Sequence, residues 1–290
     1  MTVWRWRRTR FGWRAITFWR ICRTRVLPVP ELPEVETVVR SLRPHIIGRR
    51  ILNAEFRAGR VLVGQAQKMA AAITGQKIRG IDRYGKFITI RLERGVLTVH
   101  LGMTGRLQLD APPAKWTHAI LTLDRGVLTY EDARQFGRIE YGPGIPERVA
   151  KLGPEPLEIT FDEFSRRLKA RHAPVKAALL NQAVVRGVGN IYADEALFRA
   201  GIHPKRRASS LSRDRMERLY RSMREVLAEA IESRGSSVSD YVDGQGRKGG
   251  FQMLHRVYGR TGEPCASCGA PVRKTTVAQR GTHYCGKCQK

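Results

Sequence analysis

The sequence lacks any long hydrophobic run. No uninterrupted apolar stretch approaches the roughly 18–20 residues that a helix needs to cross a bilayer, and FGWRAITFWRI (11–21) is broken by Arg14 and Arg20. Cysteine is absent between residues 23 and 264, which argues against a disulfide framework through the body of the chain. Acidic residues are absent from the first 29 residues, and internal repeats are absent throughout. These absences predict a soluble protein without a membrane partner.

Positive charge is abundant. The chain of 290 residues is long enough for two domains of about 100–200 residues each. It holds 53 Lys and Arg against 26 Asp and Glu, a formal net charge of +27. Eight of the arginines lie in the first 29 residues, so the remainder still has 45 basic against 26 acidic residues. Such an excess favours a polyanionic partner.

Four of the five cysteines lie in the last 26 residues with the spacing C-x2-C-x16-C-x2-C. They are Cys265, Cys268, Cys285 and Cys288. Two such pairs can supply four thiolates to one tetrahedral Zn²⁺. Four protein ligands leave no open coordination position, so the metal is expected to be structural. Disulfide bonds are the weaker alternative.

Hydrophobic periodicity divides the chain into two halves. Residues 31–43 have the apolar spacing of a short helix that ends before Pro44. Short alternating runs then predict strands at 49–56, 77–82, 86–92, 95–101, 105–109, 118–124, 126–132 and 137–142. Their density favours a β-sandwich. A proline-rich segment from residue 152 places the domain boundary near 150, and helices are expected at 161–170, 174–183, 190–200 and 212–233.

The segment 179–204 is a candidate DNA contact. It turns on Gly187 and Gly189 and restarts as a helix at Asn190. The N–H groups of that restart and the Asn190 side chain would face outward and could receive a phosphate. Lys176 on the preceding helix could add a phosphate contact. The alternatives are an ordinary glycine-rich helix hairpin and a merely solvated lysine.

Nine motifs, in order along residues 30–290, resemble bacterial formamidopyrimidine-DNA glycosylase. They are PELPEVE (30–36), YGKF (84–87), HLGMTGRL (100–107), EDARQFGR (131–138), LGPEPL (152–157), GVGNIYADEALF (187–198), GIHP (201–204), VYGRTGEPC (257–265) and AQRGTHYCGKCQK (278–290). The resemblance implies an α+β fold with an N-terminal β-sandwich (30–150), a helix-two-turns-helix domain (151–250) and a β-hairpin zinc finger (251–290). Residues 1–29 resemble nothing in the family.

The resemblance also implies an enzyme of base-excision repair. It would remove 8-oxoguanine and formamidopyrimidines from double-stranded DNA and cut the strand by β,δ-elimination. The nucleophile would be the free secondary amine of Pro30, which needs a chain that begins there. Glu31 would transfer protons, Lys86 would contact DNA phosphate and assist catalysis, and Arg280 would grip phosphates beside the lesion. Without the resemblance, Glu31 would be interpreted as a helix N-terminal acid and Lys86 as a turn lysine.

Further residues match the DNA-binding set of the family. Met103, Arg134 and Phe136 would fill the gap left when the damaged base is extruded. His100, Lys176 and Asn190 would complete the contacts. Taken separately, Met103 and Phe136 would be interpreted as core residues. Ala133 and Gln135 replace a proline and a second arginine found in much of the family, and the loop 236–251 matches the mobile segment that closes over the extruded base.

The N-terminal segment leaves three hypotheses open. Translation could start at Val29 from a GTG codon, a targeting peptide could be removed, or residues 1–29 could persist and leave a protein that binds damaged DNA without catalysis. Within the enzyme class, an endonuclease VIII-like preference for oxidised pyrimidines is the alternative, which PELPEVE and the ARQF loop disfavour. We expect a cytoplasmic monomer bound to DNA, with zinc and no organic cofactor.

Overall fold

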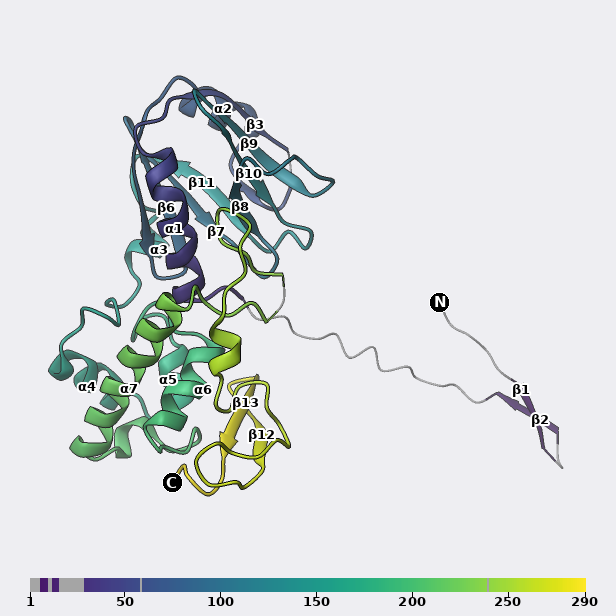
Figure 1. The fold of residues 1–290 in the computed structure, drawn as a ribbon, viewed down its shortest axis with the longest axis vertical. Coiled ribbons are helices and arrows are strands. Elements are labelled where there is room, and N and C mark those ends of the chain that lie inside the picture. Colours follow the sequence, from purple (N-terminus) through teal and green to yellow (C-terminus); the bar gives the residue numbers. More distant parts are fainter. Residues whose placement is uncertain (1–5, 10–11, 16–28, 58, 239) are drawn as a thin grey trace.

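The computed structural model describes residues 6–9, 12–15, 29–57, 59–238 and 240–290. Near the N-terminus, β1 (Trp6–Thr9) and β2 (Gly12–Ala15) form an antiparallel hairpin. Most of the segment addressed by the three N-terminal hypotheses, including Cys22, lies outside the described residues. The part that follows is elongated, with a β-sandwich at one end and a helical region with a small hairpin at the other (Figure 1).

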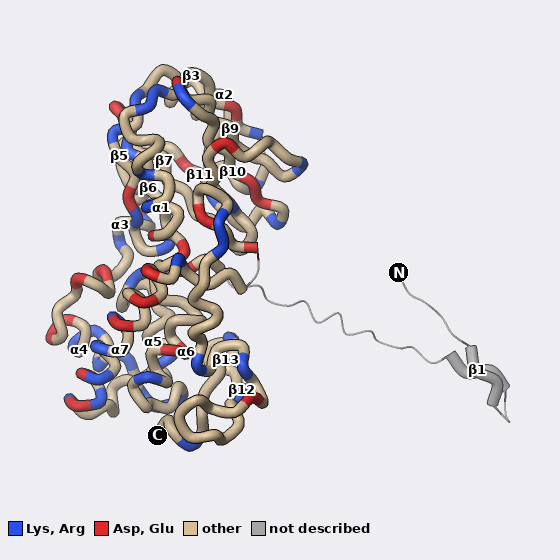
Figure 2. Tube along the Cα trace, viewed as in Figure 1, with Lys and Arg blue, Asp and Glu red and all other residues tan. Residues whose placement is uncertain are grey.

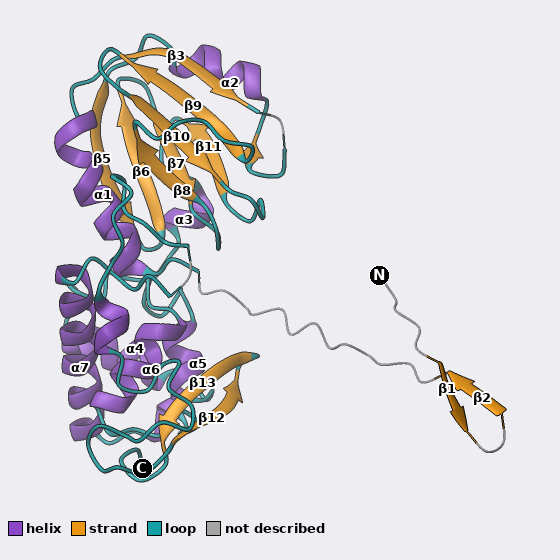
Figure 3. Ribbon diagram, turned by 45° about the vertical axis from the view of Figure 1, so that its right-hand side comes forward, coloured by secondary structure: helices purple, strands orange, loops and turns teal. Residues whose placement is uncertain are grey.

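Two sheets form the sandwich, and their strand pairs are antiparallel except for β4 with β11. One has the strand order β3-β9-β10-β8 and the other β4-β11-β7-β6-β5. Alternating apolar residues of both sheets, such as Ile88, Leu97 and Leu121, form its core. The strands are β3 (Ile51–Phe56), β4 (Leu62–Val63), β5 (Ile78–Tyr84), β6 (Phe87–Leu92), β7 (Val96–His100), β8 (Arg106–Leu109), β9 (Thr117–Leu123), β10 (Val127–Glu131) and β11 (Arg138–Gly142). Figure 3 shows them layered beside α1.

Two helices of the sandwich differ from the sequence-based prediction. Helix α1 (Leu32–Ile46) continues through Pro44 instead of ending before it. Proline removes one backbone donor, but Ile46 is fully buried, and packing of the last turn outweighs that loss. Helix α2 (Ala66–Ile73) was not predicted; it buries Met69 and Ile73, four residues apart, against β3. The predicted strands are confirmed.

The second half is helical. It contains α4 (Phe161–Lys169), α5 (Val175–Leu180), α6 (Asn190–Arg199) and α7 (Arg213–Glu232), with 3-10 turns at Ala208–Ser210 and Phe251–Leu254. Buried residues such as Phe164, Tyr192 and Leu219 form its core. The short helix α3 (Glu147–Ala150) precedes this half at the foot of the sandwich (Figure 3). Helix α7 packs along α6 and also touches α1. No helix of the described segments is both long and apolar enough to cross a membrane.

The C-terminal hairpin consists of β12 (Val272–Val277) and β13 (Arg280–Cys285). It packs against α6, and the chain end is tied to the loop after α6 because the Lys290 N–H donates to the Gly201 carbonyl at 3.1 Å. The α+β fold class, with sandwich, helical region and hairpin, is confirmed. Basic residues are distributed over all three parts, with acidic residues between them (Figure 2).

Candidate active site

The N-terminal ends of α1 and α6 meet at the candidate catalytic residues. Pro30 is buried, and the buried Glu31 is the N-cap residue directly before α1. The Glu31 carboxylate accepts hydrogen bonds from the N–H groups of Ile191 at 2.9 Å and Tyr192 at 3.4 Å, in the first turn of α6. Unpaired N–H groups and the helix dipole favour a carboxylate at this position. The N-terminus of α6 thus holds Glu31 next to Pro30.

Two glycines permit this close approach. A Cβ atom at position 189 would lie 2.3 Å from Cδ of Glu31, and the Leu32 N–H donates to the Gly187 carbonyl at 3.1 Å. The sequence-based interpretation left the N–H groups of this helix facing outward for a phosphate. That interpretation is wrong for Ile191 and Tyr192, because Glu31 occupies both groups.

Burial shifts the ionisation of the charged residues around Glu31. Burial raises the pKa of Glu31 to about 7, against a smaller opposing effect of the nearby Lys86 ammonium. Burial also raises the pKa of Glu34 and lowers the pKa of Lys86. Desolvation disfavours each charged form. Near neutral pH, Glu31 can therefore both donate and accept a proton, as an acid–base residue must.

Glu34 organises the site without having been predicted. Its Oε2 accepts the Glu31 N–H at 2.8 Å, and its Oε1 accepts the Ser236 N–H at 2.6 Å and the Tyr192 hydroxyl. The first bond belongs to a capping box, in which an acid three residues into a helix bonds the N–H at its start. The PELPEVE motif contains that spacing, so the sequence could have indicated it.

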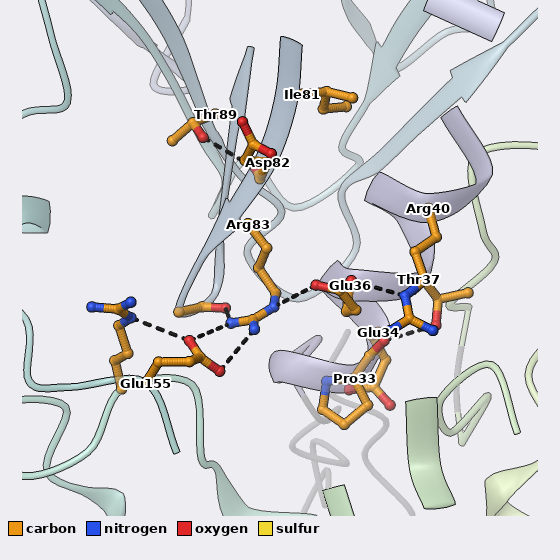
Figure 4. A network of polar contacts seen from close by, with 12 residues as sticks. Pro33, Glu34, Glu36, Thr37, Arg40, Ile81, Asp82, Arg83, Thr89 and Glu155 are labelled. Carbon is orange, nitrogen blue, oxygen red and sulfur yellow. Dashed lines mark hydrogen bonds and ion pairs between the residues drawn. The ribbon is translucent and has the colours of Figure 1, made fainter. Parts of the chain in front are cut away.

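Lys86 lies in the turn between β5 and β6, and a charged network fixes this turn against the helical region. Arg83 Nη1 and Nη2 bond the Glu155 carboxylate at 3.0 and 2.8 Å, and Arg83 Nε bonds Glu36 at 2.9 Å (Figure 4). The side chains of Arg83 and Glu155 are only 8% and 6% exposed. Arg186 stacks its guanidinium carbon 3.9 Å from the centre of the Tyr84 ring. The contact between Arg83 and Glu155, which are far apart along the chain, left no signal in the sequence.

Two loops of the sandwich carry the predicted gap-filling residues, and Asp132 joins them. Its buried carboxylate accepts the Thr104 hydroxyl at 2.6 Å and the Gly137 N–H at 2.7 Å. Arg134 and Phe136 are exposed, with the guanidinium carbon 4.7 Å from the ring centre. Phe136 is therefore not a core residue, and the part of Arg134 and Phe136 in filling the gap stays a prediction.

Met103 directly precedes Thr104 in the other of these two loops and lies near Pro30. It lines a small cavity together with Pro30, Ile191, Ser236 and Tyr241. The cavity joins residues from the sandwich, α6 and the loop 236–251. The chain thus brings Met103 next to Pro30, and its insertion into the DNA stack stays a prediction.

His100 ends β7 with its ring packed on Phe87 at a centroid distance of 4.8 Å. Burial, with Lys86 next, lowers the pKa of His100 to about 4, so the ring is neutral near pH 7. Its Nδ1 accepts the Gly102 N–H at 3.1 Å, which places the proton on Nε2. A neutral imidazole N–H can donate to a phosphate oxygen, and that role stays a prediction.

Lys176 is placed differently from the prediction. Its side chain is fully buried; Nζ lies 2.7 Å from Asp194 Oδ1 and donates to Thr282 Oγ1 at 2.8 Å and to the Gly281 carbonyl at 3.1 Å. The predicted phosphate contact is contradicted, because no part of the ammonium is exposed. Lys176 instead ties the C-terminal hairpin to the helices. Asn190 helps, since its Nδ2 donates to the Gly281 carbonyl at 3.0 Å.

Arg280 stands at the tip of the C-terminal hairpin. It is exposed and follows Ala278 and Gln279, whose φ angles of 49° and 59° lie in the left-handed region required by a tight two-residue turn. Burial is the main cause of the lowered pKa of Lys86, and the charge of Arg280 adds a smaller effect in the same direction. The contact of Arg280 with DNA phosphates stays a prediction.

The four C-terminal cysteines gather at one point. Their sulfur atoms all lie within 4.8 Å of one another, with Sγ–Sγ distances of 3.9 Å for Cys265–Cys288 and 3.5 Å for Cys268–Cys285. Disulfides have S–S distances of about 2.05 Å, so the disulfide alternative is excluded for these four. Tetrahedral zinc with Zn–S bonds of about 2.3 Å would place sulfurs roughly 3.8 Å apart. The residues fit a structural zinc ion.

The loop 236–251 forms hydrogen bonds with several neighbouring elements. The Gly244 N–H donates to Ser41 Oγ at 2.9 Å, and the Gly244 carbonyl accepts the Leu109 N–H at 2.8 Å. The Tyr241 hydroxyl donates to the Glu34 carbonyl at 3.1 Å. From Tyr241 to Phe251 this segment therefore joins α1, β8 and the end of α7, and its closure over an extruded base stays a prediction.

Comparisons with known proteins agree with this arrangement. Family models match the formamidopyrimidine-DNA glycosylase N-terminal domain over 29–139, its H2TH domain over 152–242, and the zinc finger found in FPG and IleRS over 262–290. The formamidopyrimidine-DNA glycosylase of Solibacter usitatus is 58% identical, covering 90% of this chain and all of that protein.

Solved structures give the same result. The crystal structure of the MutM (Fpg) protein from Thermus thermophilus has a TM-score of 0.82 at 45% identity, covering 90% of this chain and 98% of that one. A Lactococcus lactis Fpg mutant in complex with Fapy-dG containing DNA has a TM-score of 0.83 at 38% identity, covering 90% of this chain and 100% of that one. The chain therefore belongs to the formamidopyrimidine-DNA glycosylase family, and its C-terminal cysteines form the structural zinc site of that family.

Proposed function

We propose that this chain is a base-excision repair glycosylase that removes oxidised purines from duplex DNA and then cleaves the strand as an AP lyase. The observation that supports it most is the placement of Glu31. This buried carboxyl, whose pKa is raised to about 7, adjoins Pro30 and feels the charge of Lys86. A nucleophile next to an acid–base group and a cation is the arrangement that covalent sugar chemistry needs.

The chemistry follows from a free Pro30 amine. An α-amino group has a pKa near 8, so a useful fraction is neutral at pH 7. Its nitrogen bonds to the sugar C1′ while the bond to the damaged base breaks, and the ring oxygen leaves C1′ as the sugar opens to an iminium. Loss of a C2′ proton then expels the 3′ phosphate, and a second elimination expels the 5′ phosphate. With Val29 attached, the Pro30 nitrogen is an amide and cannot begin this sequence.

The surrounding residues transfer protons, bind phosphates and fill the gap in the DNA. Glu31 protonates the opening sugar ring, and Lys86, His100 and Arg280 hold phosphates next to the lesion. Met103, Arg134 and Phe136 enter the gap left by the extruded nucleotide. Asn190 has a buried Oδ1 without a hydrogen-bond partner in the described chain, and its amide already binds the hairpin of Arg280. Asn190 therefore supports the hairpin of Arg280, beside its predicted phosphate contact.

Oxidised purines are the preferred substrate class. The solved relatives include the Lactococcus lactis protein with Fapy-dG containing DNA and with abasic site containing DNA. An endonuclease VIII-like preference for oxidised pyrimidines is the alternative. A protein that keeps residues 1–29 would bind damaged DNA without cleaving it. We propose that the enzyme acts in the bacterial cytoplasm and binds DNA as a monomer.

Excision rates test the substrate class. Protein that begins at Pro30 is incubated with duplexes that carry 8-oxoguanine opposite cytosine or thymine glycol opposite adenine. We expect the purine lesion to be excised at least about tenfold faster, because pockets that differ in shape discriminate by this order, and we expect cleaved strands with phosphate at both ends of the gap. Faster excision of thymine glycol would contradict the proposal in favour of the endonuclease VIII-like alternative.

A further inference from the structure

Two aromatic side chains stand out on the surface of the described chain. Among its exposed large apolar residues, only Trp116 and Phe136 are aromatic, with exposures of 39% and 48%. Trp116 immediately precedes β9, and Phe136 lies in the loop that follows β10. Exposed tryptophan is costly in water, and aromatic residues on a basic protein are suited to stacking against nucleic acid.

The backbone holds Trp116 next to the loop of Arg134 and Phe136. Strands β9 and β10 are antiparallel neighbours, and a bulge occurs where Glu131 pairs with Thr117. One residue further, the Asp132 N–H donates to the Trp116 carbonyl at 2.9 Å. Asp132 is also the residue whose carboxylate joins the two gap-filling loops. Trp116 is therefore attached to the same junction that places Phe136.

The segment before Trp116 is pre-organised. Pro112 and Pro113 restrict the backbone, and a local turn closes it, because Thr117 Oγ1 accepts the Ala114 N–H at 2.8 Å while the Thr117 N–H donates to the Ala114 carbonyl at 3.1 Å. Lys115 adds charge, with Nζ 4.7 Å from the centre of the Trp116 ring. Within the described residues, no carboxylate forms an ion pair with Lys115, so its charge is available to a phosphate.

We propose that Lys115 and Trp116 form a further DNA contact, in which the indole packs against a deoxyribose and the ammonium pairs with the adjacent phosphate. The contact rests on the proposed function, because a duplex whose gap is filled by Arg134 and Phe136 must pass over this junction. This contact extends the DNA-binding surface to one side of the lesion and fixes the position of the duplex relative to Phe136.

Tryptophan fluorescence gives a direct test on the full-length chain. The other four tryptophans are at positions 4, 6, 13 and 19, so subtracting the signal of Trp116→Phe from that of the wild type isolates Trp116. A duplex with a tetrahydrofuran abasic analogue is the probe. We expect saturating DNA to quench the Trp116 signal and protect it from acrylamide. An unchanged Trp116 signal at saturation would overturn the proposal.

Affinity measurements give a second readout. Trp116→Ala is expected to weaken binding of this duplex about tenfold, within the range measured for aromatic stacking on nucleic acid, whereas Trp116→Phe should retain most of the affinity. Lys115→Ala should reduce the salt dependence of binding by about one phosphate contact. Leu52→Ala, which truncates another exposed apolar residue, on β3 (55% exposed), is the matched control and should bind like the wild type.

Equal affinities for Trp116→Ala and the wild type would contradict the proposal. Because Trp116 is exposed, Trp116→Ala and Trp116→Phe should leave the unfolding temperature unchanged. The quenching experiment needs only the conservative variant Trp116→Phe. Binding needs no free proline amine. Failure of this contact is therefore distinguishable from failure of the proposed catalysis, which would leave the quenching intact.

Discussion

Glu31→Gln is expected to lower base excision by about 10²–10⁴-fold, the usual contribution of a positioned acid–base group, when measured in protein that begins at Pro30. Glutamine is nearly the same size and can still accept the Ile191 N–H, so the fold should persist. What it cannot do is release a proton to the opening sugar. Single-turnover rates on an 8-oxoguanine duplex measure the loss.

The pH dependence of the same variant tests the cause. Because burial raises the pKa of Glu31 from its ordinary 4.5 to about 7, the folded protein holds an extra proton between these values. The contribution of Glu31 to stability is therefore greatest below pH 4.5 and falls as pH rises to 7. We expect Glu31→Gln to remove this slope from unfolding curves of the chain that retains Val29, in which the Pro30 nitrogen is an uncharged amide. In protein that begins at Pro30, we expect it to remove the decline in excision rate that follows the loss of the Glu31 proton.

Glu34→Gln is the matched control for this prediction. Glu34 is equally buried, but its carboxylate is occupied by Tyr192, Ser236 and the Glu31 N–H. We expect its substitution to lower the unfolding temperature more than Glu31→Gln does and to slow excision less. A Glu31→Gln enzyme with a wild-type rate would show that another group transfers the proton.

Loss of zinc is expected to have the second largest effect. The hairpin buries only a small core around Val257, Val272 and two of the cysteines. Structural zinc contributes about 10–16 kcal/mol to the folding of comparable modules, far more than such a core supplies. Cys285→Ser should therefore unfold the hairpin, remove Arg280 from the site and abolish strand cleavage, while the sandwich remains folded.

Metal analysis and cleavage assays check this expectation. The wild type should contain one zinc per chain and Cys285→Ser none, with DNA affinity reduced in parallel. In the chain that retains residues 1–29, Cys22→Ser, which removes the one cysteine outside the C-terminal group, should keep both the zinc and the DNA affinity. The bonds from Lys176 and Asn190 hold residues 281 and 282 independently of the metal. If these hydrogen bonds were enough to hold Arg280 in the site without zinc, Cys285→Ser would cleave DNA normally. That result would contradict the account.

The sequence predicts the sandwich well because its strands alternate and its turns carry glycine. Each expected run between residues 49 and 142 corresponds to a strand, since the alternation reflects a buried face. The sequence did not predict α2, because two buried residues, Met69 and Ile73, are too few to show a helical hydrophobic pattern. Helix α1 passes Pro44 because tertiary packing of Ile46 overrides a local preference.

The candidate site is only partly predictable from the sequence. Motifs locate Pro30, Glu31 and the cysteines, whose chemistry depends on residue type and spacing. They misplace Lys176, because a basic residue on a helix looks the same whether it meets phosphate or the buried Asp194. Contacts between distant segments, such as Arg83 with Glu155 or Glu31 with the α6 N-terminus, depend on the assembled fold and leave no local pattern.

Reductive trapping at Pro30 tests the central claim most directly. Protein that begins at Pro30 is mixed with an 8-oxoguanine duplex and sodium borohydride, and the cross-linked complex is digested and analysed by mass spectrometry. We expect one peptide beginning at Pro30 to carry the deoxyribose, and no cross-link from the chain that retains residues 1–29. A cross-link through Lys86, or none at all from correctly processed protein, would contradict the account.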